Sequence, residues 1–207
     1  MKFTLKRKEL KALSRFASKQ DIRFYLMGVC VTQDHRGTIL EATNGHMLGR
    51  LLVSMEPHET PQRVIIKSSD IDKLKGTKKT ADDWLHFTVN GQEIQVIAPD
   101  STMMLTALEG NFPDTDRVTP KVIKDEDAKP ANFNPEYLVA FMQAAEDLTG
   151  KKQTPRIFHQ GKNPALVALP AVDEFVGVLM PMRDDSYGGT LPQWFQAEAV
   201  KPEALTV

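Results

Sequence analysis

Cysteine and long apolar runs are scarce in this sequence. A single cysteine, Cys30, occurs among 207 residues, which excludes an intramolecular disulfide and a zinc site built from several thiolates. No segment approaches the roughly 20 consecutive apolar residues of a membrane helix, and the N-terminal MKFTLKRKEL lacks the apolar centre of a secretory signal. We therefore expect a cytoplasmic protein with no membrane association. Its 41% hydrophobic and 26% charged residues, with a net charge of −1, exclude a wholly disordered chain.

Familiar catalytic and nucleotide-binding motifs are also absent. There is no G-x-G-x-x-G, no G-x-x-x-x-G-K-[ST] and no G-x-S-x-G, so neither a phosphate-binding loop nor a nucleophile elbow is predicted. None of the five histidines has another histidine four residues away, the spacing that places two metal ligands on one helix face. We predict no enzymatic activity, no metal site and no cofactor.

Aspartates cluster in turn-like stretches, where their side chains commonly accept hydrogen bonds from the local backbone. A metal-dependent nuclease built on these carboxylates is the enzymatic alternative. The clusters are Asp82-Asp83, Asp114–Asp116, Asp125–Asp127 and Asp184-Asp185.

Positive charge gathers in two places despite the neutral overall balance. Such clusters indicate contact with a polyanion, and a solvated helix face is the alternative interpretation. The candidate DNA-binding residues are Lys8, Lys11, Arg15 and Lys19 in the first cluster and Lys73, Lys75, Lys78 and Lys79 in the second.

Hydrophobic periodicity predicts a βαβββ unit that occurs three times, with a repeat of about 60 residues. The first unit has a strand at Phe3–Leu5, a helix over Lys8–Ser18, and strands at Ile22–Thr32, Thr38–Ala42 and Leu51–Met55. The second has a strand at Arg63–Lys67, a helix from Ser68 or Ser69 to Leu74, and strands at Leu85–Val89, Glu93–Ile97 and Thr102–Leu108. In the third, Asn134 caps a helix that ends at Gly150, followed by strands at Arg156–Gln160, Ala165–Pro170 and Glu174–Met182.

These units predict an α+β fold with helices on one face of antiparallel sheets. The alternative is an unrelated α+β domain whose repetition is accidental. We expect a domain of two units over residues 1–118, a reduced domain of one unit over 119–185, and an irregular tail over 186–207.

Five short segments are more specific than the repeat. They are Gln20–Gly28 (QDIRFYLMG), Ala42–Leu48 (ATNGHML), Glu109–Asp114 (EGNFPD), Phe133–Leu138 (FNPEYL) and Val178–Arg183 (VLMPMR). In this order they resemble QDVRYYLNG, ATDGHRL, [DE]GxFPD, FNxxY[LV] and VVMPMR of the β-type sliding clamp of bacterial DNA polymerase III. The resemblance covers residues 1–183. It implies the DNA-clamp fold, with both units of the family's middle domain and the final half of its last domain.

The resemblance also implies an apolar pocket for short partner peptides. One departure is Met47, which stands where the family has arginine and removes a charge from the pocket rim. The matching lining residues are Arg23, Leu26, Thr43, Gly45, His46, Leu48, Pro120, Asn134, Tyr137, Val178, Leu179, Met180, Pro181, Met182 and Arg183.

The resemblance implies a DNA replication or repair processivity factor. The resemblance implies that it encircles or contacts duplex DNA without reading sequence, docks a DNA polymerase or another clamp-motif protein, and leaves room for a clamp loader. We expect a homo-oligomer, closed head to tail through sheet edges. The alternative is a clamp-like peptide-binding module that forms no ring and competes for clamp partners.

Overall fold

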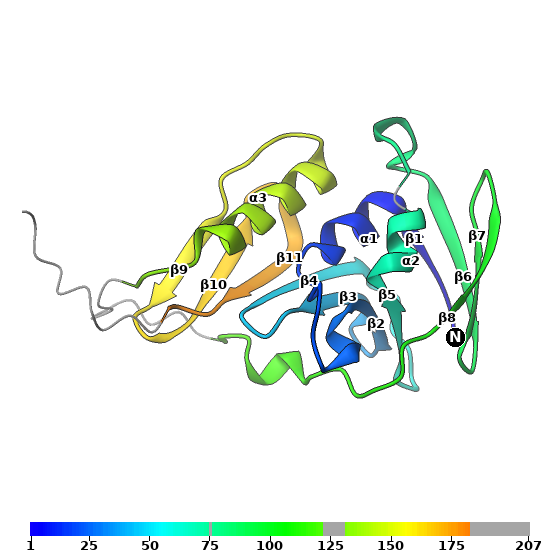
Figure 1. The fold of residues 1–207 in the computed structure, drawn as a ribbon, viewed down its shortest axis with the longest axis horizontal. Coiled ribbons are helices and arrows are strands. Elements are labelled where there is room, and N and C mark those ends of the chain that lie inside the picture. The colour runs from blue at the N-terminus through cyan, green and yellow to red at the C-terminus, as the bar shows by residue number, and fades with distance from the viewer. Residues whose placement is uncertain (75, 122–130, 183–207) are drawn as a thin grey trace, which may run out of the picture.

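The computed structural model describes residues 1–74, 76–121 and 131–182, and it consists of antiparallel sheets with helices on one side (Figure 1). The first unit contains β1 (Lys2–Lys6), α1 (Arg7–Ser14), the 3-10 helix η1 (Phe24–Leu26), β2 (Gly28–Asp34), β3 (Gly37–Thr43) and β4 (Met47–Ser54). The second contains β5 (Gln62–Lys67), α2 (Ser68–Leu74), η2 (Lys78–Thr80), β6 (Trp84–Asn90), β7 (Glu93–Ile97) and β8 (Thr102–Thr106). After η3 (Thr115–Arg117) come α3 (Pro135–Thr149), β9 (Arg156–Gln160), β10 (Asn163–Leu169) and β11 (Val172–Leu179).

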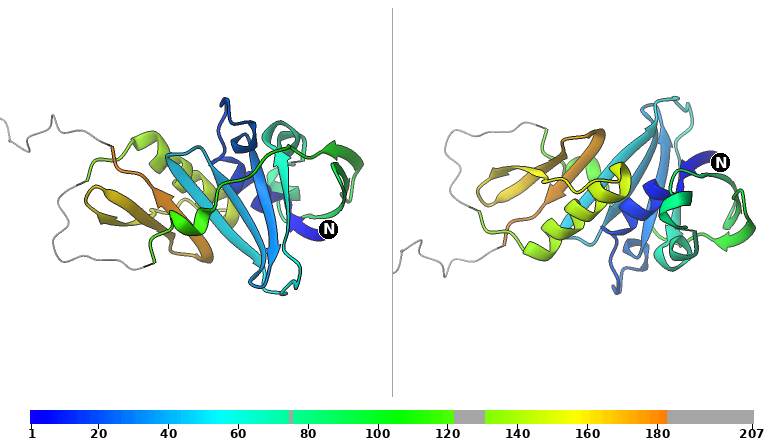
Figure 2. Two further views of the ribbon diagram at one scale, coloured as in Figure 1. Left: turned by 90° about the horizontal axis from the view of Figure 1, so that it is seen from below. Right: turned by 90° about the horizontal axis from the view of Figure 1, so that it is seen from above.

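This element order confirms the predicted fold class. All strand pairs are antiparallel, and Figure 2 shows α1, α2 and α3 on the same side of the larger sheet. No helix in the described ranges is both long and apolar enough to cross a membrane.

The first two units exchange their leading strands. The four-stranded sheet has the order β1-β6-β7-β8, so the strand that begins the first unit pairs with the second unit. The seven-stranded sheet has the order β5-β2-β3-β4-β11-β10-β9, so the strand that begins the second unit pairs with the first. The two units are therefore interlocked, and neither could complete its sheet alone.

The main core lies between the sheets and the helices. Leu10 and Leu13 of α1, with Phe16 just after it, are buried there together with Ile71 and Leu74 of α2. A smaller apolar cluster of Leu26, Cys30, Ile65 and Phe112 covers the opposite face of the larger sheet near β2 and β5. The chain that leads to η3 crosses this face, and the Leu108 N–H donates to the Ile65 carbonyl oxygen (2.9 Å).

The third unit joins the first through β4 and β11. Gly49 and Gly177 are opposite each other at the centre of this strand pair. A Cβ on Gly49 would overlap the Phe16 ring, and a Cβ on Gly177 would overlap the Phe141 ring. The two rings lie 4.9 Å apart between centroids. One ring from each unit therefore packs on one glycine of each strand, an approximately twofold arrangement.

Several sequence-based boundaries were wrong. Helix α1 ends at Ser14 rather than Ser18, because the Phe16 N–H bonds to the carbonyl of Leu13 three residues back, as in a tighter 3-10 turn. The strand predicted from Ile22 begins only at Gly28, since Ile22 and Phe24 are 91% and 69% exposed and leave no buried face.

The segment that leads into the last unit, 122–130, lies outside the described residues. No strand precedes α3 among residues 131–134, so the described part of this unit reads αβββ. The division into domains 1–118 and 119–185 stays a prediction, and the continuous seven-stranded sheet runs across it. The predicted tail, 186–207, lies outside the described residues.

Candidate functional site

The turn between β3 and β4 lies at the centre of the predicted peptide-binding surface. The Thr43 hydroxyl donates a hydrogen bond to the Met47 carbonyl oxygen (2.7 Å) and accepts one from the Gly45 N–H (3.0 Å). The Asn44 side chain accepts hydrogen bonds from the N–H groups of His46 (2.9 Å) and Met47 (3.0 Å). Gly45 has a φ of 90°, which residues with a Cβ rarely adopt, so glycine and these bonds together fix the turn.

Arg23 lies against this turn. A Cβ added at Gly45 would be 3.3 Å from Arg23 Nη2, so glycine gives the guanidinium room. Arg23 donates to Asp21 from Nη2 (2.8 Å) and Nε (3.0 Å). These side-chain hydrogen bonds lower the pKa of Asp21 to about 2. The arginine is therefore held beside the turn with its charge offset by a carboxylate.

The start of α3 and the end of β11 meet the same turn. The rings of His46 and Tyr137 are stacked, with centroids 6.0 Å apart and an interplanar angle of 11°. The Met180 N–H donates to the His46 carbonyl oxygen (2.9 Å), and the Met182 N–H donates to that of Asn132 (2.8 Å). Met180 and Met182 are 39% and 52% exposed. The backbones of two exposed methionines are thus bonded to His46 and to the segment before α3, and their flexible thioethers suit adaptable apolar contact.

Two other predicted lining residues underlie this surface. Leu48 and Val178 are opposite each other across β4 and β11. Because side chains alternate along a strand, they lie on the face opposite to Met47 and Leu179. Each is 3% exposed, so both support the surface from beneath.

Several predicted residues do not reach this surface. Leu26 is 1% exposed and packs in the smaller apolar cluster with Cys30. Leu179 is fully buried in the main core. Met47 was expected at the pocket rim, but it is 7% exposed and also belongs to the main core. Strand alternation directs these last two side chains toward the helices.

The remaining predicted positions border the region or lie outside the described chain. Thr119, which precedes Pro120, accepts a hydrogen bond through its hydroxyl from Arg50 of β4 (3.3 Å). This bond connects the loop to the sheet. Asn134 is the N-cap of α3, and Pro181 is half-buried. Arg183 lies outside the described residues.

The predicted DNA-facing residues of α1 are engaged by acidic side chains. Lys8 Nζ is 2.7 Å from Asp82 Oδ1, and Lys11 Nζ is 2.8 Å from Asp147 Oδ1. Arg15 also bonds to Asp147 through Nε. The positive charge of this helix face is therefore largely compensated within the chain.

The second basic cluster is freer. Lys73 pairs with Asp70 of the same helix (2.8 Å). Within the described residues, Lys78 and Lys79 form no ion pair and are exposed, and the same holds for Lys19 of the first cluster. Lys75 lies outside those residues.

Helix α3 contrasts with α1 because it contains no lysine or arginine. A cavity of about 440 Å³ is lined by residues of α1, η2 and α3. Lys8, Lys11 and Lys78 line one side of it, and Glu146 and Asp147 line the other. The helical side of the molecule therefore carries unpaired positive charge at η2 and acidic side chains at the end of α3, while the charges of α1 are paired.

These acidic partners were not predicted from the sequence. Asp82 was noted only as part of a turn, and Asp147 lies on the helix that was predicted to end at Gly150. The acidic end of α3, Glu146-Asp147, was the available signal. Nothing in the sequence indicated that the Asn132 carbonyl would bond to Met182.

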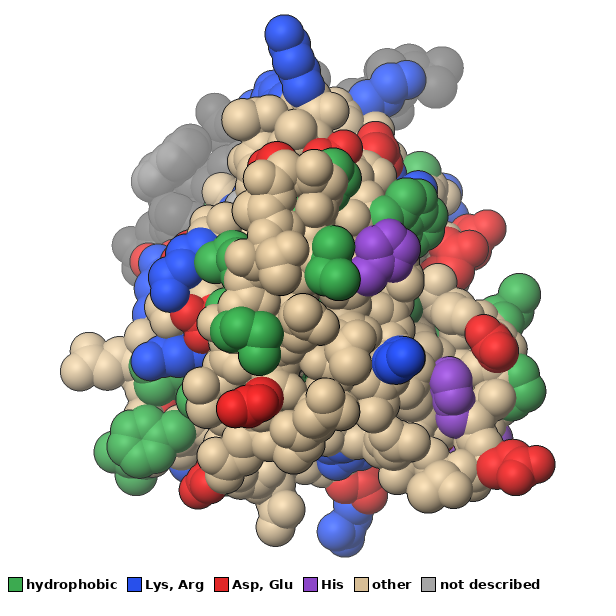
Figure 3. All heavy atoms as spheres, turned by 90° about the vertical axis from the view of Figure 1, so that its right-hand side faces the viewer, with side chains coloured by type: hydrophobic (Ala, Val, Ile, Leu, Met, Phe, Trp, Pro, Cys, Tyr) green, Lys and Arg blue, Asp and Glu red, His purple; other side chains and the backbone are tan. Residues whose placement is uncertain are grey.

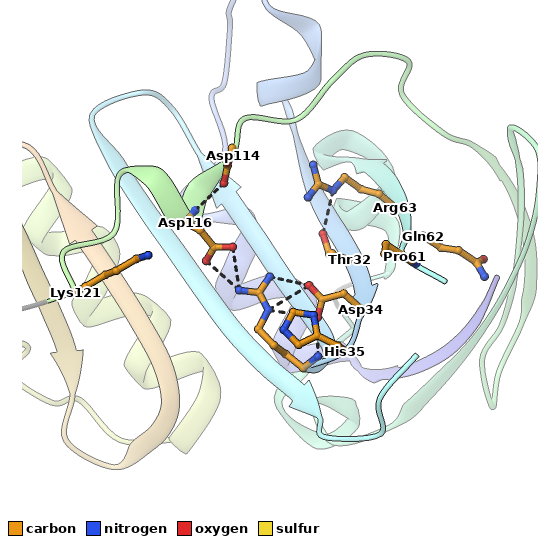
Figure 4. Close-up of a pocket in the computed structure, with 10 residues that line it drawn as sticks. Thr32, Asp34, His35, Pro61, Gln62, Arg63, Asp114, Asp116 and Lys121 are labelled. Atoms are coloured by element: carbon orange, nitrogen blue, oxygen red, sulfur yellow. Dashed lines mark hydrogen bonds and ion pairs between the residues drawn. The ribbon is translucent and has the colours of Figure 1, made fainter. Parts of the chain in front are cut away.

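The Asp114–Asp116 cluster lies beside a second cavity, of about 830 Å³ (Figure 4). Arg36 donates from Nη2 to Asp34 (2.7 Å) and from Nη1 to Asp116 (2.9 Å). These hydrogen bonds lower the pKa of Asp34 and, against the opposing effect of burial, that of Asp116. Asp114 accepts a hydrogen bond from the Asp116 N–H (3.1 Å) and caps η3.

These carboxylates therefore have structural partners. In the part of the chain that the structure describes, no group of three or more His, Cys, Asp or Glu side chains is placed to hold a metal ion. The clusters Asp125–Asp127 and Asp184-Asp185 lie outside that part.

Two interlocked βαβββ units, joined through β4 and β11 to a third unit, define the class of the fold: it is that of the DNA sliding clamps. Solved structures of DNA polymerase III beta subunits have this fold. The subunit from Pseudomonas aeruginosa superposes with a TM-score of 0.71 at 20% identity, over 89% of this chain and 67% of that one. The corresponding protein from Streptococcus pneumoniae gives 0.68 at 19% identity, over 89% and 65%.

A putative beta subunit from Eubacterium rectale matches at 11% identity with a TM-score of 0.68, over 89% of this chain and 66% of that one. The chain thus spans about two thirds of the length of these clamps. No protein-family model and no curated protein matches the sequence.

Proposed function

We propose that this protein is a non-enzymatic, cytoplasmic processivity factor that docks polymerase-type partners by short peptides. The observation that carries the proposal is the convergence of His46, Tyr137 and Met180 from three segments of a clamp fold. Exposed methionines, an aromatic ring and a nearby arginine suit a peptide with one aliphatic and one aromatic anchor. Gly45 gives the Arg23 guanidinium room beside this surface.

Peptide binding provides the first test. A fluorescent clamp-motif peptide is titrated with the protein, and polarisation gives the Kd. Tyr137→Ala and Met182→Ala each remove an anchor contact, and loss of about 2 kcal/mol at such a position raises Kd about 30-fold. Met142→Ala is the matched control, because Met142 is 41% exposed on α3 but has no place in the proposed surface. Equal Kd values for all variants would refute this site.

We propose further that the helical side contacts duplex DNA through phosphates. Lys78 and Lys79 are the best placed contributors, since they form no ion pair within the described residues. Each phosphate contact releases counterions, so the observed affinity should fall steeply with salt and not depend on base sequence. Lys78→Glu combined with Lys79→Glu should reduce the salt slope.

We propose that the protein also encircles DNA as a closed ring. If a ring needs as many units as the clamp family has, about four three-unit chains would close it, and a clamp loader would open it. A closed ring stays on circular DNA and is released when the circle is cut, so retention on plasmid before and after linearisation measures encirclement directly.

The second candidate function is a peptide-binding module that forms no ring and competes for clamp partners. The compensated charges of α1 and the acidic character of α3 favour it, because both weaken attraction for DNA. This module predicts the same loss of peptide binding in Tyr137→Ala, without retention on circular DNA.

A further inference from the structure

Strand β8 is an open edge of the four-stranded sheet. Its other side pairs with β7, where Val96 is opposite Met103 and Ile94 opposite Leu105. The Ala107 N–H donates to the Gln92 carbonyl oxygen (2.8 Å), and hydrogen-bonded pairs alternate along an antiparallel ladder. Met103 and Leu105 therefore bond to β7. The backbone groups of Thr102, Met104 and Thr106 point away from the sheet, and no described strand pairs with them.

The composition of β8 differs from that of the other sheet edges. Its sequence, TMMLT, has no charged side chain, and Met104 is 61% exposed. By contrast, β1 carries Lys2 and Lys6, and β9 carries Arg156. Charges on an edge strand oppose pairing with another chain. This protection is missing from β8, and hydrophobic side chains are exposed at that end of the molecule (Figure 3).

The fourth edge, β5, is covered. The chain after β8 returns along it, where the Leu108 N–H donates to the Ile65 carbonyl oxygen (2.9 Å) and Arg63 Nη1 donates to the Phe112 carbonyl oxygen (3.4 Å). Of the edges in the described residues, β8 is the one that is uncovered and uncharged.

The chain itself shows how an equivalent edge is closed. Strand β4 is the last strand of the first unit, as β8 is of the second and β11 of the third. Strand β4 pairs antiparallel with β11, and the contact is approximately twofold: Met47 is opposite Leu179 and Leu51 opposite Phe175, about the central pair Gly49 and Gly177. The last strands of two units thus close each other's edge.

We propose that β8 of a second copy of this chain closes the β8 edge, by antiparallel pairing about a true twofold axis at Met104. This register places the outward backbone groups of Met104 opposite their own copies and those of Thr102 opposite Thr106 of the second copy. It keeps exposed side chains on one face and buried ones on the other. In this arrangement each β8 strand faces the side chains of an identical strand. A charged residue at the axis would face the same charge, so the absence of charge avoids repulsion.

This contact differs from the head-to-tail assembly expected from the sequence. A head-to-tail contact joins two different edges, whereas the β8 contact is isologous and closes as a dimer unless another surface extends it. It requires neither DNA nor peptide binding, so it stands independently of the proposed function.

Cysteine cross-linking at the axis tests the geometry. In the full-length Met104→Cys variant, mild oxidation with copper phenanthroline should give a reducible covalent dimer, since hydrogen-bonded strand positions lie about 5.5 Å apart between Cα atoms. The natural Cys30 is fully buried and should not interfere. Phe158→Cys, at a 36% exposed position on β9, is the matched control and should remain monomeric on reducing-agent-free gels.

Solution mass tests whether the contact holds the native protein together. Light scattering across protein concentrations should show a dimer or larger even-numbered assembly for the parent chain and for Met104→Val. Met104→Pro should give monomer, because it removes an N–H that points outward and leaves the bonds to β7 intact. Its circular dichroism should match the parent spectrum. A parent chain that is monomeric throughout, an assembly that survives Met104→Pro, or cross-linking only at position 158 would overturn the proposal.

Discussion

The opposed glycines of the β4–β11 junction allow a quantitative prediction. A Cβ at Gly177 would overlap the Phe141 ring. That ring is fully buried and lies 4.9 Å from the Phe16 ring and 6.2 Å from the Phe175 ring between centroids, so it has little room to move. Overpacking a tight core costs about 1–3 kcal/mol. We therefore expect Gly177→Ala to lower the free energy of unfolding by this amount, and the melting temperature by about 2–12 °C.

A double-mutant cycle separates this clash from other effects of alanine. Phe141→Leu removes the ring at a cost below the about 3–5 kcal/mol of a Phe→Ala change. In that background the added methyl meets a smaller side chain, so Gly177→Ala should cost less than about 1 kcal/mol. The coupling energy between the two changes should reach about 0.5–3 kcal/mol. Urea unfolding followed by circular dichroism measures each free energy, provided that the m-value is unchanged.

The control pairs Gly177→Ala with Met142→Leu. Met142 is adjacent to Phe141 on α3 but is 41% exposed, so its substitution should be additive with Gly177→Ala. Additive free energies in the Phe141→Leu cycle would refute the packing argument, as would a Gly177→Ala variant as stable as the parent.

Three further predictions concern charge, thiol chemistry and helix capping. Hydrogen bonds from Arg36 lower the pKa of Asp34 and, against the opposing effect of burial, that of Asp116. The pKa values of both groups are therefore lower in the folded than in the unfolded protein. The resulting stabilisation is present above about pH 4 and is lost as pH falls through the folded pKa values. Urea unfolding should thus show that Arg36→Ala lowers stability at neutral pH and has a smaller effect near pH 2. Burial raises the pKa of Cys30 to about 12, so Ellman's reagent at pH 8 should label it only when urea unfolds the protein; rapid labelling of native protein would contradict this. Asn134→Ala should cost about 0.5–2 kcal/mol of stability, and Asn134→Asp should restore most of it, as measured by thermal unfolding.

Features that depend on local sequence were predicted well. Asn134 with the following proline, and Gly150 in a left-handed conformation with a φ of 75°, begin and end α3 as expected. Asn90-Gly91, a dipeptide typical of hairpin turns, joins β6 to β7. In each case a few adjacent residues determine the backbone conformation, so the helix end or turn can be predicted from the local sequence.

Features that depend on distant segments were not predictable from periodicity. The exchange of β1 and β5 and the pairing of β4 with β11 depend on which sheet edge each strand joins. The alternating hydrophobic pattern of a strand is the same whichever edge it joins, so it does not predict the neighbour. The candidate site divides in the same way. Motifs identified the turn around Gly45, whereas the burial of Leu26 and the neutralisation of Lys11 by Asp147 arise only when separate elements pack together.

The exchange of leading strands also sets an order of events during synthesis. Thr4 of β1 is opposite His86 of β6, a separation of 82 residues along the chain. At translation rates of about 5–20 residues per second, β1 waits about 4–16 s for its neighbour to be made. During that time Phe3 and Leu5 have no sheet to enter, and Lys2 and Lys6 beside them discourage premature association. The strand made first is therefore among the later ones to reach its final position, and a ribosome stalled after β4 would hold a unit that cannot yet finish folding.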